Sequence, residues 1–375
     1  MSDHHIVLVG GGHTHVQVLE AFGDRPEPGA RLTLVTDRRE TPYSGMLPGH
    51  IAGHYAREAM HIDLRRLAER CRVAFVPQAA AGIDRGRREL LLADGARLPY
   101  DTLSLNVGVT PDLSGMAGAD RFALAVKPIS SLLDRLDAIV AAAGTTHGPR
   151  RILVVGGGPA GVEIALALKT RLDPAGQAAG RPWIGLAAGG GLVPTLNAGV
   201  QRKVRAALAR RDVALLDPCR IVEITPEEAV DETGRRIAAD LVIVSTAARA
   251  PDWLASTGLI RAADGSVLTR PTLATLDDEA IFAVGDCAAI AGDRREKAGV
   301  FAVRQGPPLI ANLRRRVRGD PLQTYRAQRD ILTILSTGDG GAIAGRGTWL
   351  AVEGRWVWLW KDWLDRRFMT RFQSS

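Results

Sequence analysis

Short apolar runs alternate along this chain with longer segments in which apolar residues recur at helical spacing. In the first part of the chain this pattern predicts strands at 6–9, 31–36 and 100–108, helices at 14–22 and 61–70, and a hairpin at 88–98. Asp94 and Gly95 supply the turn of the hairpin. Alternating strands and helices of this kind are typical of an α/β fold.

The same order of elements recurs further along the chain. The predicted elements there are a strand at 151–155, a helix at 160–171, a strand at 183–188, a helix at 198–211 and an exit strand at 240–246. The interval from first strand to exit strand is similar in both halves. We therefore predict a duplicated Rossmann-like unit, with a parallel central sheet in each α/β domain. The alternative is a chance likeness between two ordinary α/β domains.

Glycines follow the first strand of each half. The run Gly10-Gly11-Gly12 comes after strand 6–9, and the run from Gly156 to Gly161 comes after strand 151–155. Such a loop holds a pyrophosphate, because glycine lets the backbone approach the anion and the free N–H groups of the following helix face it. Two loops predict two dinucleotides, and therefore electron transfer between them.

A third signal lies at 281–286, where a short apolar strand ends on Gly285 and Asp286. The glycine lets the backbone come close to a ligand. Together with the two glycine loops, this segment resembles the two-dinucleotide-binding flavoproteins of the pyridine nucleotide–disulfide oxidoreductase superfamily. The resemblance covers about residues 4–325 and is closest to type II NADH dehydrogenase-like proteins.

Three stretches narrow the resemblance further. Residues 12–15 (GHTH), 41–49 (TPYSGMLPG) and 298–306 (AGVFAVRQG) are similar to the flavoprotein module found fused to selenide, water dikinase. This chain lacks the dikinase half. The resemblance implies an FAD-binding domain in two pieces, 1–110 and 265–325, with an NAD(P)-binding-like domain inserted at 111–264. Residues 326–375 would form a small C-terminal α+β cap.

The resemblance also assigns residues to the two cofactors. Those assigned to FAD are Gly10, Gly12, His13, His15, Gly108, Gly285 and Asp286, and those assigned to NAD(P)H are Gly156, Gly158 and Gly161. His13 and His15 would lie beside the FAD pyrophosphate, and Asp286 would accept a hydrogen bond from the ribityl chain. Thr36 and Asp37 are both candidates to bind the adenosine ribose. Simple alignment with the family favours Thr36, whereas Asp37 is the better chemical candidate because an acidic residue normally binds this ribose.

The second domain departs from the family pattern after its second strand. Residues 184–194 contain no acid that would bind the NADH ribose, and no arginine for a 2′-phosphate. The glycine loop itself is intact. The choice between NADH and NADPH, and the tightness of binding, stay open at this point.

Three residues are candidates for chemistry at the flavin. Lys127 occupies a position where related enzymes place a lysine near flavin N5, and Glu163 matches a family glutamate near the flavin and nicotinamide. Gln305 precedes a predicted helix at 307–317 whose N-terminus would stabilise negative charge on the flavin pyrimidine. Lys127 and Glu163 each have an ordinary alternative, respectively a surface lysine before a proline-started helix and a first-turn helix acid.

The cysteines are too few and too scattered for a dithiol relay. Cys71, Cys219 and Cys287 form no pair, and residues 41–54 hold none. We therefore expect hydride transfer from NAD(P)H to FAD, followed by two-electron transfer to a small-molecule acceptor, with a quinone as the leading candidate. Val300 replaces a glutamine of related quinone reductases, which weakens the quinone assignment. The alternatives are a flavin-dependent step in selenium or sulfur metabolism, and a redox sensor with little turnover.

Bulk composition narrows the class of protein. The net charge is +7, but the arginines are dispersed, so nucleic-acid binding is not expected. His50 and His54 are spaced for one helix face, yet no further ligand completes a metal site. The free cysteines, and the absence of a signal peptide or a spanning apolar run, indicate the cytoplasm.

Tryptophan gathers near the C-terminus. Five of the seven tryptophans lie between 349 and 363, and from Trp360 onward apolar residues recur at 363, 364, 368 and 372. This spacing predicts an amphipathic helix. Its apolar side either lies on a membrane surface, over 356–372, or packs on the FAD domain or on a second subunit of a homodimer.

Overall fold

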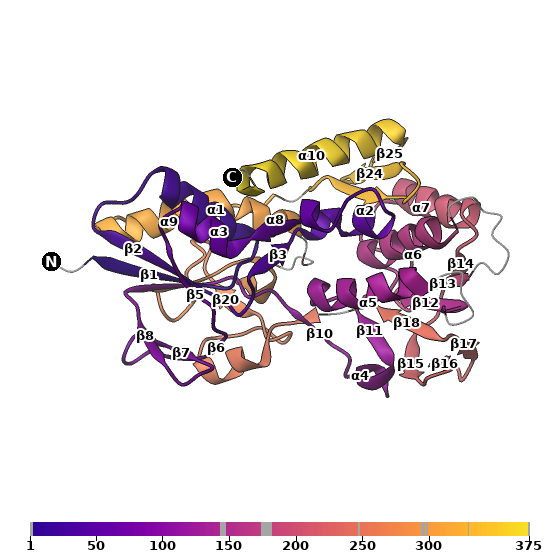
Figure 1. The fold of residues 1–375 in the computed structure, drawn as a ribbon, viewed down its shortest axis with the longest axis horizontal. Coiled ribbons are helices and arrows are strands. Elements are labelled where there is room, and N and C mark those ends of the chain that lie inside the picture. Colours follow the sequence, from indigo (N-terminus) through magenta and orange to yellow (C-terminus); the bar gives the residue numbers. More distant parts are fainter. Residues whose placement is uncertain are drawn as a thin grey trace.

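The computed structural model describes residues 3–142, 148–173, 182–246, 248–293, 297, 299–328 and 330–373. Residues 4–105 and the segment 281–283 together build a five-stranded parallel sheet (Figure 1). In spatial order its strands are β21 (Ile281–Ala283), β9 (Thr102–Leu105), β1 (His4–Val9), β2 (Ala30–Val35) and β5 (Ala74–Val76). Val9 is level with Val35 and Leu105, so the ends of three strands meet where the first glycine loop begins.

Alternate residues of β1 face opposite layers, as expected for a strand buried on both sides. Ile6 and Leu8 pack under the helices α1 (His13–Asp24), α3 (Leu64–Arg70) and α9 (Gly306–Arg318). Val7 and Val9 pack toward an antiparallel sheet on the other face, formed by β6 (Ala80–Asp84), β7 (Glu89–Leu92) and β8 (Arg97–Pro99). The hairpin predicted at 88–98 is β7 and β8.

The helix predicted at 61–70 divides into two elements. Residues 61–63 form β4 (His61–Asp63), which pairs with β3 (Glu40–Pro42), and only the remainder is helical. The reason is a cap: the Asp63 carboxylate accepts the backbone N–H of Arg66 at 2.9 Å, which starts α3 at Leu64.

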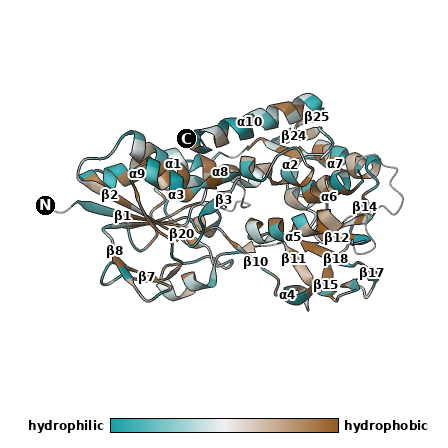
Figure 2. Cartoon of the chain, in the orientation of Figure 1, coloured by the Kyte–Doolittle hydropathy of each residue, from teal (hydrophilic) through white to brown (hydrophobic). Residues whose placement is uncertain are grey.

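Residues 123–244 build another five-stranded parallel sheet. In spatial order its strands are β11 (Ala123–Ala125), β18 (Leu241–Val244), β12 (Arg151–Val155), β13 (Trp183–Ala187) and β14 (Ala214–Leu216). The helices α5 (Ile129–Ala142), α6 (Pro159–Leu172) and α7 (Ala198–Arg210) accompany it. A three-stranded antiparallel sheet adjoins it, formed by β15 (Ile221–Ile224), β16 (Glu228–Asp231) and β17 (Arg236–Ala238). Figure 2 shows apolar residues concentrated in the two central sheets. The predicted α/β fold class is therefore confirmed.

The chain leaves the first sheet after β9 and returns to it with β21, which pairs with β9. The two connections run side by side, because β10 (Thr110–Pro111) pairs with β19 (Ala248–Arg249). The strands β20 (Val267–Thr269) and β22 (Ala288–Ile290) come before and after β21 in the chain and pair with each other. The domain bounds of 1–110 with 265–325, 111–264 and 326–375 stay a prediction.

The C-terminal part is a small α+β unit. Its antiparallel strands are β23 (Thr333–Ser336), β24 (Ala342–Arg346) and β25 (Leu350–Gly354), and the chain ends on the helix α10 (Arg355–Gln373). In Figure 1 α10 (yellow) lies along one edge of the molecule above α8 (Gly299–Arg304) and α2 (Leu47–Ile51). Among the described residues, no helix has both the length and the apolar character needed to span a bilayer.

The apolar residues of α10 divide between two faces. Val357, Phe368, Met369 and Phe372 are buried against the body of the protein. Trp356, Leu359, Trp360, Trp363 and Leu364 are exposed, as is Trp349 on the preceding hairpin, at 81 %. The predicted helix is present, but the single apolar side expected from 363 to 372 is not, because Phe368 and Phe372 point inward and Trp363 outward.

Candidate functional site

The first glycine loop closes around one buried side chain, Asn106, at the end of β9. Gly10 has φ +88, and a Cβ there would lie 2.5 Å from the Asn106 backbone oxygen. A Cβ at Gly12, the N-cap of α1, would collide with the Asn106 amide. The Asn106 Oδ1 atom accepts the backbone N–H groups of Thr14 and His15 at 3.2 and 3.3 Å. Gly10 is therefore required by its conformation and by close packing, whereas Gly12 is required by close packing alone.

Asn106 also reaches the third glycine motif. Its Nδ2 donates to the Val284 carbonyl at 3.1 Å, and a Cβ at Gly285 would lie 2.5 Å from Nδ2. Gly285 has φ +69, which glycine adopts without strain. Asn106 thus connects the loop after β1 to the loop after β21. Sequence reasoning missed it; the available signal was a polar residue between the apolar end of β9 and Gly108, which has φ +71.

The two predicted histidines play different parts. His15 is fully buried, and its Nδ1 and Nε2 atoms lie 2.7 Å from the Gly10 carbonyl and 2.9 Å from the Ser104 hydroxyl. Burial lowers the His15 pKa to about 4. Because both ring nitrogens are engaged inside the protein, the ring supports the loop, and the predicted contact of the ring with a pyrophosphate does not fit this geometry.

His13, the first residue of α1, faces the site. Its Nε2 lies 3.4 Å from the Ser44 hydroxyl, and its buried Nδ1 has no hydrogen-bond partner among the described residues. Burial lowers the His13 pKa to about 4, with Asp286 opposing the shift and Lys127 adding to it. Its ring centroid is 5.1 Å from that of Tyr43. An unpartnered buried ring nitrogen beside a helix N-terminus suits a polar ligand.

Lys127 joins the two domains at this point. It follows β11 in the second domain, and its Nζ donates to Asp286 Oδ2 at 2.6 Å in the first. Gln305, the N-cap of α9, is buried, and its Oε1 accepts the backbone N–H of Gly285 at 2.6 Å. Gln305 therefore positions the loop that carries Asp286, and the N-terminus of α9 begins directly behind that loop.

Thr36 and Asp37, the two candidates to bind the adenosine ribose, differ in burial and in hydrogen bonding. Thr36 is buried and its hydroxyl accepts the backbone N–H of Arg38 at 3.2 Å, so the hydroxyl stabilises the turn after β2. Asp37 is exposed at the end of β2, and its carboxylate is 3.8 Å from Arg38. Asp37 is the residue with a carboxylate available to a ligand.

The second glycine loop repeats the geometry of the first. A Cβ at Gly156 (φ +128) would lie 2.5 Å from the Ser245 backbone oxygen, just as one at Gly10 would meet Asn106. A Cβ at Gly161 would collide with the Gly156 carbonyl, so this glycine permits the helix to pack on the strand. Gly158, the N-cap of α6, faces open space.

The end of β13 holds a residue that the local sequence did not reveal. Gly189 follows this strand, and a Cβ on it would be 2.9 Å from the Arg220 Cβ. Arg220 is exposed and pairs weakly with Glu232 at 3.5 Å. The prediction that no arginine lies in 184–194 is correct for the local chain, but folding brings one alongside from the segment before β15.

Glu163, on the first turns of α6, faces the C-terminal unit. Its Oε1 accepts the backbone N–H of Ser336 on β23 at 2.8 Å. Burial raises the Glu163 pKa from 4.5 to about 7, while the charge of Lys361 opposes the shift and that of Asp365 adds to it. Lys361 Nζ in turn donates to Asp365 at 2.6 Å and to the Gly45 carbonyl at 2.5 Å. These contacts fasten α10 over the stretch 41–49.

The three thiols are buried, and the two histidines predicted to share a helix face contact the main chain. Cys71, Cys219 and Cys287 are buried and unpaired, and burial raises the Cys287 pKa to about 11. His50 and His54 bind different main-chain carbonyls, those of Tyr55 and Gly338.

Both loops fit a dinucleotide: glycines lie where side chains would collide, helix N-termini face the loops, and the His13 Nδ1 lacks a partner. The fold and the site define a two-dinucleotide oxidoreductase. Residues 4–312 match the pyridine nucleotide-disulphide oxidoreductase family, and the chain belongs to this family. It is an enzyme that uses FAD and a nicotinamide dinucleotide.

Comparison with individual proteins agrees with this assignment. Ferroptosis suppressor protein 1 of Taeniopygia guttata is 26% identical over 308 residues, which cover 77% of this chain and 78% of that protein. The sulfide:quinone oxidoreductase of Aquifex aeolicus superposes with a TM-score of 0.83 at 18% identity, covering 99% of this chain and 91% of that one. NDH2 from Plasmodium falciparum, in complex with NADH, superposes with a TM-score of 0.82 at 13% identity, covering 99% and 97%. The resemblance to NADH dehydrogenase-like proteins is confirmed, whereas the likeness to the selenide, water dikinase module stays a prediction.

Proposed function

We propose that this enzyme passes hydride from NAD(P)H to FAD and then two electrons to a quinone. The observation that carries the proposal is the Lys127–Asp286 ion pair, which holds the second glycine-loop domain against the loop of the first. Stacking two rings at such a junction removes most of the entropic cost of bringing reactants together. FAD supplies the two-electron carrier between the two substrates.

The chain's own residues have distinct parts in this scheme. The loops at Gly10–Gly12 and Gly156–Gly161 hold the two pyrophosphates, and Asp37 binds the adenosine ribose of FAD. Lys127 places a positive charge beside Asp286, where it stabilises added negative charge. Gln305 holds the Gly285–Asp286 loop in position.

Glu163 is suited to handling protons. With a pKa of about 7, its carboxyl group is partly protonated at neutral pH. Reduction of a quinone to a hydroquinone consumes two protons with the two electrons. Lys361 and Asp365 of α10 act on Glu163 through their charges, so the protonation of Glu163 responds to the side of the molecule where the C-terminal helix packs.

The quinone is favoured as acceptor for two reasons. A dithiol acceptor has no cysteine pair to relay through, because all three cysteines are buried and unpaired. In addition, the structurally similar Aquifex enzyme is a sulfide:quinone oxidoreductase, as its name states.

Anaerobic stopped-flow reduction of the bound flavin by NADH and by NADPH tests the first half-reaction, and mixing the reduced enzyme with menadione tests the second. Gly158→Ala is the informative variant. Its methyl group enters open space, so folding is unaffected, but the space is where the pyrophosphate approaches the backbone. We expect reduction to slow about ten-fold with the FAD content unchanged. Gly115→Ala is the matched control, because a Cβ there also meets nothing. If neither dinucleotide reduces wild-type flavin within seconds, the proposal is wrong.

We further propose that the exposed face of α10 lies on an anionic membrane surface. Trp356, Leu359, Trp363 and Leu364 are 57, 52, 52 and 38 % exposed and share one side of the helix, and Trp349 on the preceding hairpin is 81 % exposed. Tryptophan and leucine with basic neighbours suit the membrane interface. We expect wild-type protein to cosediment with vesicles of phosphatidylglycerol and phosphatidylcholine.

A double variant, Trp356→Ser with Trp363→Ser, should stay in the supernatant, while Phe122→Ser, which alters an apolar side chain of 37 % exposure on the distant α4 (Ala119–Phe122), should not change binding. Sedimentation equilibrium distinguishes the homodimer: if the double variant turns a wild-type dimer into a monomer and does not change vesicle binding, this face joins two copies instead.

A further inference from the structure

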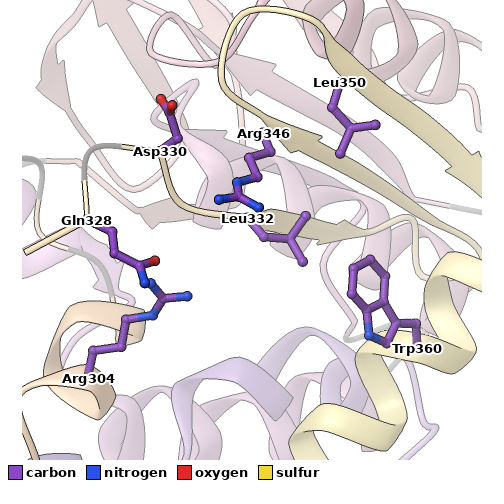
Figure 3. A pocket seen from close by; sticks show the side chains of 7 residues that line it. All are labelled: Arg304, Gln328, Asp330, Leu332, Arg346, Leu350 and Trp360. Atoms are coloured by element: carbon purple, nitrogen blue, oxygen red, sulfur yellow. The ribbon is translucent and has the colours of Figure 1, made fainter.

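A cavity of about 350 Å³ lies between the end of α8, the hairpin β24–β25 and α10 (Figure 3). It is lined by Arg304, Gln328, Asp330, Leu332, Arg346, Leu350 and Trp360. Its volume is that of a small-ligand pocket. None of its lining residues belongs to either glycine loop, and it is separate from the dinucleotide-binding residues described above.

Two guanidinium groups project into this space in Figure 3. The Arg304 Nη1 atom is buried and has no hydrogen-bond partner among the described residues. Arg346 is exposed and makes no side-chain hydrogen bond or ion pair within the part of the chain that the structure describes. A buried donor without a partner costs free energy, and a ligand oxygen would remove that cost. Two unpaired arginines facing one cavity select a negatively charged group.

The acid in the lining does not neutralise them. The Asp330 carboxylate points away from Arg304 and Arg346 in Figure 3. It lies against the turn of the hairpin, where a Cβ at Gly347 would be 3.6 Å from its carboxyl carbon. Arg304 is half-buried and Arg346 is exposed, and no carboxylate among the described residues pairs with either guanidinium group.

The rest of the wall is apolar. Trp360, on α10, presents its ring to the cavity, and Leu332 and Leu350 lie on the hairpin side (Figure 3). A flat aromatic body would pack on the Trp360 ring while its charged group meets the guanidinium groups. The cavity thus combines one recognition element for an aromatic ring with another for an acid.

The cavity is next to the proposed flavin site. Arg304 directly precedes Gln305, whose side chain accepts the N–H of Gly285 at 2.6 Å. We propose that this cavity binds the electron acceptor and selects an aromatic acceptor that carries an acidic group, such as a sulfonate or a carboxylate. The role of the ligand as electron acceptor rests on the proposed function, whereas the selection of an aromatic anion does not.

Binding is tested without turnover, by calorimetry on FAD-loaded enzyme with no dinucleotide present. The probes are naphthalene-2-sulfonate and its neutral counterpart naphthalene-2-sulfonamide. We expect the sulfonate to bind about ten-fold more tightly, which is the effect of one hydrogen bond to a charged group. Arg346→Gln and Arg304→Gln should each abolish this preference. Arg355→Gln, an exposed arginine at the start of α10 outside the cavity, should leave it intact.

Equal affinity for the two probes in the wild type overturns the inference, as does sulfonate binding that survives both arginine substitutions. A turnover arm compares 1,4-naphthoquinone-2-sulfonate with 1,4-naphthoquinone, and we expect Arg346→Gln to raise the KM of the sulfonate alone about ten-fold. Flavin that NADH and NADPH leave oxidised, together with a preserved sulfonate preference, would refute the proposed function and keep the anion site. Rapid flavin reduction without any preference would do the reverse.

Discussion

Replacing Glu163 with glutamine should change how the stability of this protein depends on pH. The Glu163 pKa is raised from 4.5 to about 7, chiefly by burial. Between these values the unfolded chain releases a proton that the folded protein keeps, so stability falls as pH rises through this window. A shift of this size lowers the free energy of unfolding by about 3 kcal/mol, and the full loss is reached above the folded-state pKa.

Glutamine keeps the contact with β23, because its Oε1 can still accept the Ser336 N–H, but it carries no proton to lose. We therefore expect Glu163→Gln to match the wild type near pH 4.5 and to exceed its free energy of unfolding by about 3 kcal/mol at pH 8. Urea unfolding at pH 5, 6, 7 and 8, with excess FAD, measures this difference. Burial also raises the Asp365 pKa, so only the comparison of the two proteins isolates Glu163. Parallel pH curves for wild type and variant would refute the buried-acid reasoning.

The ionisation of Glu163 should also affect how kcat depends on pH. If protonated Glu163 supplies a proton, kcat falls above pH 7, and Glu163→Gln loses that limb together with part of its rate. The neighbours provide an internal check, since Lys361 lowers the Glu163 pKa and Asp365 raises it. Lys361→Met should move the limb to higher pH and Asp365→Asn to lower pH. Shifts in the same direction would contradict the assignment.

Three further substitutions test other parts of the site. Asn106→Leu removes the acceptor of the Thr14 and His15 N–H groups, so it should lower stability by about 2 kcal/mol and release FAD during gel filtration, whereas full FAD retention would show that Asn106 is dispensable. Lys127→Met removes the cation proposed to lie near flavin N5, and a partly exposed charge interaction of about 1 kcal/mol with the reduced flavin would make the midpoint potential about 20 mV more negative, with Lys127→Arg as the control in a dye-equilibration titration. Arg220→Ala should raise the KM for NADPH about ten-fold and leave that for NADH unchanged, and an equal effect on both would remove Arg220 from 2′-phosphate recognition.

The sequence was most informative where structure is determined by neighbouring residues. The runs 6–9 and 151–155 form β1 and β12, and the glycines after them have the close approaches that the motif predicts. Strand periodicity and glycine loops depend on residues a few positions apart, so they leave a readable pattern. The prediction of a helix at 61–70 was wrong at its start, because the cap at Asp63 and the pairing of β4 with β3 outweigh helical periodicity and the helix begins at Leu64.

Most of the candidate site depends on partners that are distant in the chain. Asn106 contacts the backbone of residues about ninety positions earlier, and Lys127 meets Asp286 after the chain has passed through the whole second domain. Such pairs share no spacing rule, so one sequence cannot reveal them. The family resemblance supplied Lys127 and Asp286 separately, but their ion pair came only from the fold.

The helix α10 shows why the cap should not be regarded as a detachable anchor. Phe368 stacks on Tyr43 at 4.8 Å, and Tyr43 in turn lies beside His13 at the first glycine loop. Lys361 donates a hydrogen bond to the Gly45 carbonyl, and Trp360 lines the cavity that Arg304 and Arg346 face. Deleting this helix would expose the proposed flavin site and remove part of the proposed acceptor pocket, so loss of activity on truncation would say nothing about membranes. Surface substitutions at Trp356 and Trp363 leave the inner face intact, and only they separate a surface-docking role from a structural one.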